Sequence, residues 1–361
     1  MMKLFNITLI LALFTTMSYA NNTPEVIRHE KTKTIRKEFS VNKNATLFID
    51  NRYGNVNVTS WNQNRIEIDV KITVKGGSLS NVNDKLNGID VEFQSSKDLV
   101  KAKTIIESNK SSWSWWKKNN TSFKIHYTVK MPITNNAEFH NKYGNIELDE
   151  LRGKSNINCD YGNIEIGKLH NADNMIEINY CGSSEIDYMR SGNVSADYST
   201  LKIDESEKLK TSSDYSTIKV GNVESVYFNS DYGSVVIRDA VDIHGNSDYA
   251  GVKIGTVRKN LTIDTDYGSV KVQNIKKGFE QINIEGSYAG IRLGTEADNN
   301  FTFNVSLSYA GFSYPSDKVD MNKSIKKSTK KYYEGVFGNG SSSSAINIKS
   351  SYGGVTLKLN D

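Results

Sequence analysis

DYSTIKVGNVESVYFNSDYGSVVIRDAVDIHGNSDYAGVKI, residues 214–254, contains three copies of one pattern. In each copy Asp-Tyr is followed by a small residue and then by apolar and polar residues in alternation. The tyrosines are Tyr215, Tyr232 and Tyr249, each 17 residues after the one before. Self-similarity at a short, nearly fixed period is the signature of a repeat architecture, so this stretch decides the fold.

The same unit recurs over most of the chain, at spacings of 17 to 21 residues. Ten tyrosines form one series: Tyr143, Tyr161, Tyr180, Tyr198, Tyr215, Tyr232, Tyr249, Tyr267, Tyr288 and Tyr309. Two further copies, at Tyr53 and Tyr352, stand apart from it. The repeat is therefore regular over residues 141–314, with one isolated copy before this part of the chain and one after it.

Alignment on the tyrosine shows which positions of the repeat are buried. The third and fifth residues after it are apolar, as in Val252 and Ile254, and a polar residue such as Lys253 lies between them. The fourth and sixth residues before it are apolar as well, and the second residue before it is small. This period-two alternation predicts strands with one buried face. Its parity changes across the tyrosine, which predicts a bend or bulge that a following Gly, Ser or Ala would suit.

The length of the repeat selects the fold class. A strand–helix–strand unit needs roughly 30 residues, so about 18 residues hold only two strands and a corner. The chain is predicted to be all-β, a single-chain parallel β-solenoid (β-helix) with a strand-rich N-terminal capping region. Ten coils stacked at about 4.8 Å would form a rod about 50 Å long. An antiparallel meander is the alternative, but it needs two tight hairpins per repeat, and each repeat offers one strong corner.

The N-terminus has the features of an export signal. Lys3 precedes the apolar stretch 4–14, and Ser18-Tyr19-Ala20 has the small-x-small form of a signal-peptidase site. No later segment approaches the roughly 20 apolar residues that span a bilayer. We therefore expect a signal peptide at 1–20 and a chain exported to the periplasm, the cell surface or the medium.

Departures from the repeat divide the rest of the chain. Four alternating runs that break it are expected to be hairpin strands: Arg65–Lys75, Gly88–Phe93, Leu99–Glu107 and Ser122–Met131. The predicted segments are a lead-in at 21–45, an N-terminal β-region with the first coil and a hairpin insert at 46–140, the regular solenoid at 141–314, an insertion loop at 315–340, and a C-terminal coil and cap at 341–361.

Charge and cysteine content exclude some functions. The chain has 45 Lys and Arg against 41 Asp and Glu, a balance that does not indicate a nucleic-acid partner. The two cysteines, Cys159 and Cys181, fall in different columns of adjacent coils and, by parity, on opposite faces. Because a disulfide needs Cα atoms within about 7 Å and facing Cβ vectors, we expect both thiols to be free.

The coil Asn-Arg-Tyr-Gly-Asn-Val at Tyr53, the strand-rich insert and the repeated Asp-Tyr-Gly-Ser-Val units together resemble the bacterial secreted putative-adhesin domain family, a domain of unknown function of β-helix type. The resemblance covers roughly residues 40–361. It implies a β-helix and an adhesin-like role in the cell envelope. It brings no catalytic residues and no cofactor.

One segment stands out as a candidate ligand-binding site. Trp113, Trp115 and Trp116 crowd four positions among Ser, Asn and Lys, and Lys117 and Lys118 follow them. Exposed aromatic residues mark binding patches, and the lysines would attract anionic sugars or lipid headgroups. The alternative is a hairpin tip folded back over the solenoid.

Three further features have a functional and a structural interpretation. The aspartates before the tyrosines could bind cations, but Asp also caps turns, and a neighbouring column of Lys and Arg offers compensation. The tyrosine column could hold a glycan, but stacking between coils is favoured. A basic segment with Lys323, Lys326, Lys327, Lys330 and Lys331 could contact anionic polysaccharide, but a solvated loop is favoured.

We expect no enzyme. The chain contains no HExxH or Gly-x-Ser-x-Gly motif, and neither cysteine lies in a metal-type pair, so catalytic residues, metals and cofactors are all predicted to be absent. The predicted function is an adhesin-like binding or scaffold protein of the bacterial cell envelope, with a glycan or another envelope component as its partner. The alternatives are a purely structural spacer and a polysaccharide-acting β-helix enzyme.

Overall fold

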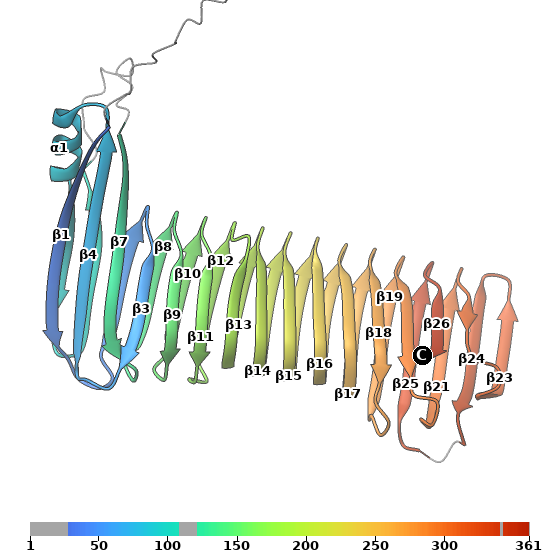
Figure 1. Ribbon diagram of the computed structural model, residues 1–361. Helices are drawn as coiled ribbons and strands as arrows, with labels where there is room; N and C mark the ends of the chain where they lie inside the picture. Colours follow the sequence, from blue (N-terminus) through green and yellow to red (C-terminus); the bar gives the residue numbers. More distant parts are fainter. Residues whose placement is uncertain (1–27, 108–120, 340–341, 361) are drawn as a thin grey trace, which may run out of the picture.

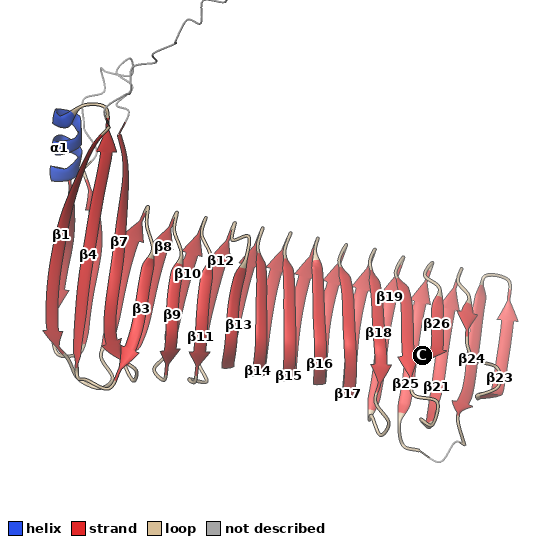
Figure 2. Cartoon of the chain, in the orientation of Figure 1, coloured by secondary structure: helices blue, strands red, loops and turns tan. Residues whose placement is uncertain are grey.

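The computed structural model describes residues 28–107, 121–339 and 342–360 (Figure 1). Strands make up most of this part of the chain (Figure 2), and α1 (Leu79–Asn87) is the one helix in it. The prediction of an all-β chain is therefore confirmed. None of the described helical structure is long and apolar enough to cross a membrane.

Parallel strands form the middle of the molecule, and each repeat pairs in register with the next. Asp214, for example, lies beside Asp231, which lies beside Asp248. We call this row of parallel strands the stack. It includes the repeats at either end of the row that continue the parallel pairing. Its regular strands are β8 (Asn136–Lys142), β9 (Ile146–Leu151), β10 (Ser155–Asp160), β11 (Ile164–Leu169), β12 (Asn174–Asn179), β13 (Ser184–Asp197), β14 (Thr200–Asp214), β15 (Thr217–Asp231), β16 (Ser234–Asp248), β17 (Gly251–Asp266), β18 (Ser269–Ile275), β19 (Gln281–Ser287) and β20 (Gly290–Thr295).

The core of the stack consists of the apolar columns that alternation predicts. Ile237, Val252 and Val272 are fully or almost fully buried in one continuous cluster, while Arg238 and Lys253 are exposed. Large and small residues compensate across coils. Phe228 lies opposite Gly245, where a Cβ atom would come within 2.0 Å of the phenylalanine ring. The inward and outward assignments are confirmed.

The corner of each repeat differs from the expectation. The tyrosine itself, and not the small residue after it, adopts the left-handed conformation, with φ between 47° and 63° in all twelve repeats. The next residue is small because it faces inward against the neighbouring coil. At Gly233 a Cβ atom would lie 2.0 Å from the carbonyl oxygen of Ser216. The tyrosine N–H donates to the coil that follows, as from Tyr215 to the carbonyl of Asp231 at 3.0 Å.

The N-terminal region combines parallel and antiparallel pairing. Its strands are β1 (His29–Ser40), β2 (Thr46–Arg52), β3 (Val56–Trp61), β4 (Arg65–Gly76), β5 (Ile89–Ser95), β6 (Leu99–Ile106) and β7 (Thr121–Pro132). β1–β4–β7 and β5–β6 are antiparallel, whereas β2 and β3 join β8 and β9 in parallel. The four predicted alternating runs coincide with β4 to β7, and the lead-in supplies β1.

Helix α1 was not predicted. Leu79, Val82 and Leu86 follow helical spacing, and Val82 is fully buried. The segment is only nine residues long and lies between strands, so its helical period is too short to stand out from the period-two runs on either side.

The C-terminal end departs from the prediction in two ways. Its strands are β21 (Phe301–Ser308), β22 (Phe312–Ser313), β23 (Val319–Lys327), β24 (Lys330–Phe337), β25 (Ala345–Ser351) and β26 (Val355–Leu359). The segment predicted as an insertion loop at 315–340 forms the antiparallel hairpin β23–β24, which pairs with β21. The last coil of the chain does not end the stack, because β25 pairs with both β19 and β21. Antiparallel pairing was expected at the N-terminal end, in the hairpin insert, but not at the C-terminal end.

Candidate binding surfaces

The repeat tyrosines form a continuous ladder on the surface. Neighbouring ring centroids lie 4.6–5.1 Å apart with planes 1–24° from parallel, and each tyrosine is 41–60% exposed. The ring faces cover one another, so the ladder presents ring edges and hydroxyls to water. A sugar stacks on a free aromatic face, and such faces are taken up within the ladder. This arrangement favours the structural interpretation of the tyrosines.

The two ends of the ladder are unlike. The ring of Phe123 covers Tyr53 edge-on at 5.1 Å, and the ammonium group of Lys85 lies over Phe123 at 4.5 Å. At the other end Tyr309 stacks on Tyr352 and is the most exposed of the series. The open end of the ladder therefore lies beside the C-terminal hairpin.

The aspartates beside the ladder form a second outward column. Asp197, Asp214, Asp231, Asp248 and Asp266 are in register on five consecutive coils, and none of the ion pairs in the described residues involves them. The pKa of Asp197 is raised, mainly by desolvation and then by repulsion from Asp214. Desolvation and repulsion from the neighbouring aspartates also raise the pKa of Asp231. The expected compensation by lysines is wrong, because those lysines lie beyond the corner on the following strand. Carboxylates alone at this spacing repel one another, and we assign them no ligand.

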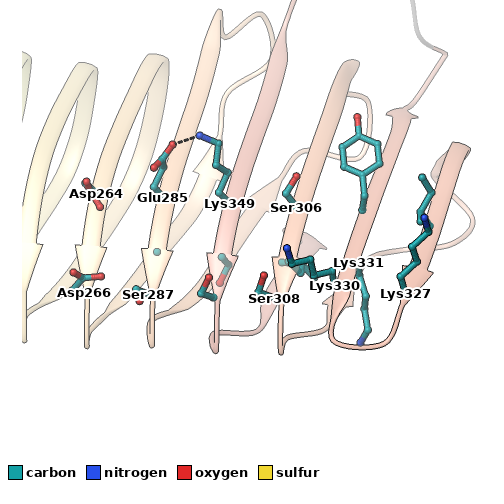
Figure 3. Close-up of a pocket in the computed structure, with 16 residues that line it drawn as sticks. Asp264, Asp266, Glu285, Ser287, Ser306, Ser308, Lys327, Lys330, Lys331 and Lys349 are labelled. Atoms are coloured by element: carbon teal, nitrogen blue, oxygen red, sulfur yellow. Dashed lines mark hydrogen bonds and ion pairs between the residues drawn. The ribbon is translucent and has the colours of Figure 1, made fainter.

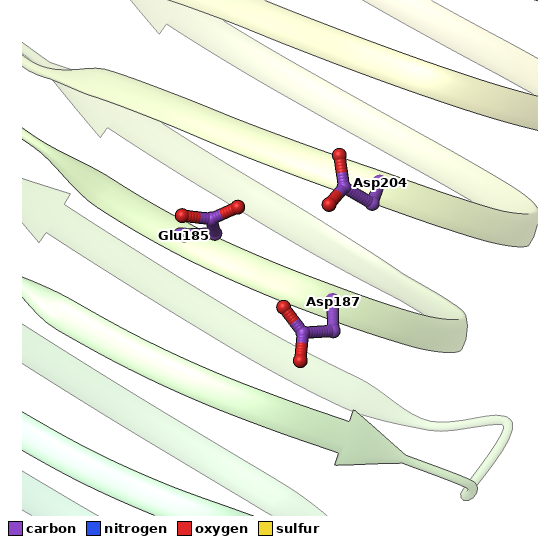
Figure 4. A group of neighbouring side chains, drawn as sticks. All are labelled: Glu185, Asp187 and Asp204. Carbon is purple, nitrogen blue, oxygen red and sulfur yellow. The ribbon is translucent and has the colours of Figure 1, made fainter.

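A smaller acidic group contains Glu185, Asp187 and Asp204 on β13 and β14 (Figure 4). The ammonium group of Lys202 lies 2.6 Å from a Glu185 oxygen and 2.9 Å from an Asp204 oxygen. A cation of the chain itself therefore occupies the space between Glu185 and Asp204, and we assign this group no metal ion.

Both cysteines are buried on the inside of the stack. The expected separation on opposite faces is wrong, because the parity change at the tyrosine turns both positions inward. Sγ of Cys181 donates to the carbonyl oxygen of Cys159 at 3.2 Å. The hydrogen bond with the Cys181 thiol, together with burial, holds the pKa of Cys159 far above its usual value.

The tryptophan segment lies outside the described residues. Trp113, Trp115, Trp116, Lys117 and Lys118 fall between β6 and β7, in the interval 108–120. Their role in recognition stays a prediction of the sequence.

A groove of about 570 Å³ lies where the stack meets the C-terminal hairpin (Figure 3). Asp264 and Asp266 of β17 and Glu285 of β19 form its acidic side. Serine hydroxyls from successive coils line the middle: Ser287, Ser306, Ser308, Ser350 and Ser351. The other side is basic and consists of Lys327 of β23 with Lys330 and Lys331 of β24.

Two of the groove lysines have no internal partner. Lys349 is paired with Glu285 at 2.5 Å, and Lys331 donates to the carbonyl oxygen of Ala310 at 2.9 Å. Lys327 and Lys330 are register partners across the hairpin, are exposed, and make no ion pair or side-chain hydrogen bond with the described residues. Two like charges directly opposite destabilise a strand pair, and an anion between them would relieve that repulsion.

Sequence reasoning found these lysines but missed the groove. The hairpin that carries them was expected to be a solvated loop. The acidic side and the serines come from other strands, some before the hairpin in the chain and one, β25, after it, so the groove exists only once β23–β24 docks on β21.

No protein-family model and no curated protein matches the chain. Among solved structures it is similar to a putative cell adhesion protein from Clostridium sporogenes, at 10% identity over 91% of this chain and 100% of that one, with a TM-score of 0.19. A putative adhesin from Parabacteroides merdae is 12% identical over 72% and 95% of the two chains, with a TM-score of 0.32. A putative lipid binding protein from Parabacteroides distasonis is 12% identical over 90% and 96%, with a TM-score of 0.26. At these scores the likeness identifies neither a family nor a ligand.

Proposed function

We propose that the chain is an exported, adhesin-like binding or scaffold protein of the bacterial cell envelope. It is a β-solenoid that performs no catalysis. The observation that supports a binding role is the groove at the C-terminal end, in which Lys327 and Lys330 lack partners and face a row of serines. The in-register stack holds this groove at the opposite end from the N-terminal β-region (Figure 1).

The chemistry of the groove favours an acidic glycan. Lysine ammonium groups bind carboxylate or sulfate through charge-assisted hydrogen bonds, which contribute about 1.5–3 kcal/mol each. Serine hydroxyls donate to and accept from sugar hydroxyls. The carboxylates of Asp264 and Asp266 would repel an anionic group from the far side of the groove, so the acidic group of a bound sugar is placed at the hairpin.

The first test is a glycan array probed with residues 21–361, followed by titration with polygalacturonate as a carboxylated glycan. Substitution of both Lys327 and Lys330 by Ala should weaken binding by about 100-fold, because each of the two lost charge-assisted contacts is worth at least about 1.4 kcal/mol, or tenfold. The melting temperature should not fall, since the two side chains repel each other in the free protein.

The matched control removes the same charge elsewhere. Lys168 and Lys208 are exposed residues of the stack away from the groove, and their double substitution by Ala should leave binding unchanged. Equal losses in the two double variants would mean nonspecific attraction and contradict the groove. Absence of any glycan binding would favour the alternative of a purely structural spacer. Release of reducing ends from the polymer would favour the alternative of a polysaccharide-acting enzyme.

A further inference from the structure

The strands that follow the tyrosines carry a charge gradient along the stack. The fourth or fifth residue after each tyrosine points outward and pairs in register with its equivalents on the neighbouring coils. In spatial order this column is Glu147, Glu165, Glu185, Lys202, Lys219, Val236, Lys253, Lys271 and Arg292. Its charge changes sign once, near the middle of the row.

The next outward column, two residues further along each strand, repeats the same polarity. It contains Asp149, Asp187 and Asp204 toward the N-terminal end and Arg238 toward the C-terminal end, with glycines between them. We call the two columns together the graded face. Its acidic half is Glu147, Asp149, Glu165, Glu185, Asp187 and Asp204, and its basic half is Lys219, Arg238, Lys253, Lys271 and Arg292.

The two halves cannot neutralise each other within one molecule. Successive coils are about 4.8 Å apart, so Lys253 lies about 24 Å from Glu165, well beyond the Debye length at physiological salt. Only at the boundary do opposite charges meet, where Lys202 pairs with Glu185 and Asp204. Glu147, Glu165 and Asp187, like Lys219, Lys253, Lys271 and Arg292, make no ion pair within the described residues.

We propose that the graded face is a self-association surface, on which a second copy of this chain binds face to face with its stack reversed. The two-fold axis lies between the faces, parallel to the strands, at the boundary between the repeats of Tyr198 and Tyr215. Under this operation each acidic coil meets a basic one. Glu147 faces Lys271 of the second copy, and Glu165 faces Lys253.

The inner coils match less completely. Asp187 faces Arg238 of the second copy, and Glu185 faces Val236 beside it. At the axis Lys202 faces Lys219, and this like-charged pair is offset by Glu185 and Asp204, which both pair with Lys202 within one copy. A contact of this kind is isologous, since each pair occurs twice, and it closes at two subunits.

The shape of the face suits this contact. A hollow of about 690 Å³ lies over the acidic half, lined by Glu147, Asp149, Glu165, Glu185 and Asp187 among others. A second hollow, of about 450 Å³, borders Lys271 and Arg292. The second column contains glycines such as Gly167 and Gly255, where a Cβ atom would collide with the carbonyl oxygen of Asp149 or Arg238 on the neighbouring coil, so no side chain lies there between the charged residues. Long Lys and Arg side chains of one copy can therefore reach into the acidic hollow of the other.

The test is sedimentation velocity of residues 21–361 at two salt concentrations. At about 0.1 M salt the Debye length is about 10 Å and a dimer is expected, whereas at about 1 M it is about 3 Å and the dimer should dissociate. A wild-type chain that stays monomeric at low salt and high protein concentration would overturn the proposal.

Charge-swap variants identify the face. Lys253→Glu with Lys271→Glu places carboxylates opposite Glu165 and Glu147 of the second copy, and Glu147→Lys with Glu165→Lys places ammonium groups opposite Lys271 and Lys253. Each variant alone should be monomeric, and an equimolar mixture of the two should form a heterodimer. Lys168→Glu with Lys208→Glu, which changes the same charge elsewhere on the stack, should leave the wild-type dimer intact.

The remaining outcomes separate this surface from other partners. If the two swapped variants do not associate when mixed, the face does not recognise a second copy. Binding of polygalacturonate to Lys253 and Lys271 without any self-association would overturn the proposal and show that the partner of this face is a polyanion. The groove variant with Lys327 and Lys330 replaced should still dimerise, so failure of the groove and failure of the dimer are told apart.

Discussion

At the scale of single residues, the repeat tyrosine combines an unfavourable backbone conformation with a favourable side-chain position. A left-handed φ costs an L-residue about 1–2 kcal/mol, and it is rare for bulky residues. Each inner tyrosine recovers free energy through two stacked neighbours, each pair contributing about 0.5–1.5 kcal/mol. The exposed hydroxyl keeps the edge of the ladder hydrated, which explains why Tyr and not Phe occupies the position.

Tyr232 allows this balance to be measured. Tyr232→Ala loses stacking with Tyr215 and Tyr249 and keeps the backbone strain, so it should destabilise by about 1–3 kcal/mol. Tyr232→Gly relieves the strain and should be less destabilising than Ala, and Tyr232→Phe should be nearly neutral. The measurement is the denaturant midpoint of each variant.

Tyr227 is the matched control for this series. It is exposed and stacks on His244, but it lies in a regular strand. There Gly should be worse than Ala by about 0.5–1 kcal/mol, the usual order in a strand. The same order at Tyr232 would show that the left-handed backbone carries no cost.

At the scale of elements, in-register pairing turns one residue type into a column across many strands. This favours apolar columns, which pack, and aromatic columns, which stack. It disfavours charged columns, because each inner aspartate beside the ladder, such as Asp231, faces two others. Register is set by the inward residues, so the aspartates cannot move apart by sliding without exposing the core.

Asp231 therefore has an unusual pH dependence. Because its folded-state pKa is raised, the folded protein binds this proton more tightly than the unfolded chain, and stability rises as pH falls from neutral through that pKa. Asp231→Asn should stabilise at neutral pH by about 0.2–1 kcal/mol, at the low end because of solvent screening. The gain should vanish near about pH 3.5, where the aspartate is protonated.

Asp298 should behave in the opposite way. The hydrogen bond from Lys277 holds the pKa of Asp298 below its usual value. The ionised carboxylate therefore stabilises the folded protein at pH values above the pKa of the unfolded chain, and this stabilisation is lost as the pH falls through the folded-state pKa. Asp298→Asn should lower the melting temperature at neutral pH, and the loss should shrink in acid. Melting curves of Asp231→Asn and Asp298→Asn at neutral pH and in acid test the two opposite effects together. A change of the same sign in both variants at neutral pH would contradict the opposite pKa shifts of the two aspartates.

At the scale of the whole molecule, the C-terminal coil lies inside the stack. Tyr352 stacks between Tyr288 and Tyr309, with centroid distances of 4.6 and 4.8 Å. The hairpin β23–β24 then pairs with β21 and covers that end of the row. An exposed stack end is a template for pairing with other chains, and an antiparallel hairpin with lysines at its tip blocks it.

Cysteine cross-linking tests this order in a background with Cys159 and Cys181 replaced by Ala and Ser. Ser287→Cys with Ser351→Cys, and Ser351→Cys with Ser308→Cys, should each form a disulfide, because these residues are register partners about 4.8 Å apart. Ser287→Cys with Ser308→Cys should not, since β25 lies between them and two coil spacings separate them by about 9.6 Å. Mass spectrometry of the proteolytic peptides identifies which pairs are cross-linked. Cross-linking of Ser287→Cys with Ser308→Cys alone would show that the coils stack in the order of the chain, with β21 next to β19.

The strands, their inward and outward faces and the place of the corner in each repeat follow from the sequence alone, although the left-handed conformation of the tyrosine does not. These properties are local: Val252 is buried and Lys253 exposed because a strand alternates, whatever its neighbours are. The charge sequence of the graded face could also be read from the aligned repeats, although its meaning needed the stack to place the columns side by side.

The tertiary structure alone decided which coil lies next to which, and therefore the groove. Every repeat carries the same columns, so the contact of one coil with any other is nearly equivalent, and the pattern cannot specify that β25 lies between β19 and β21. Helix α1 and the hairpin β23–β24 interrupt the repeat, and no repeated position marks where they dock. Lys327 and Lys330 acquired their surroundings only through that docking, because the serines and aspartates opposite them come from other coils.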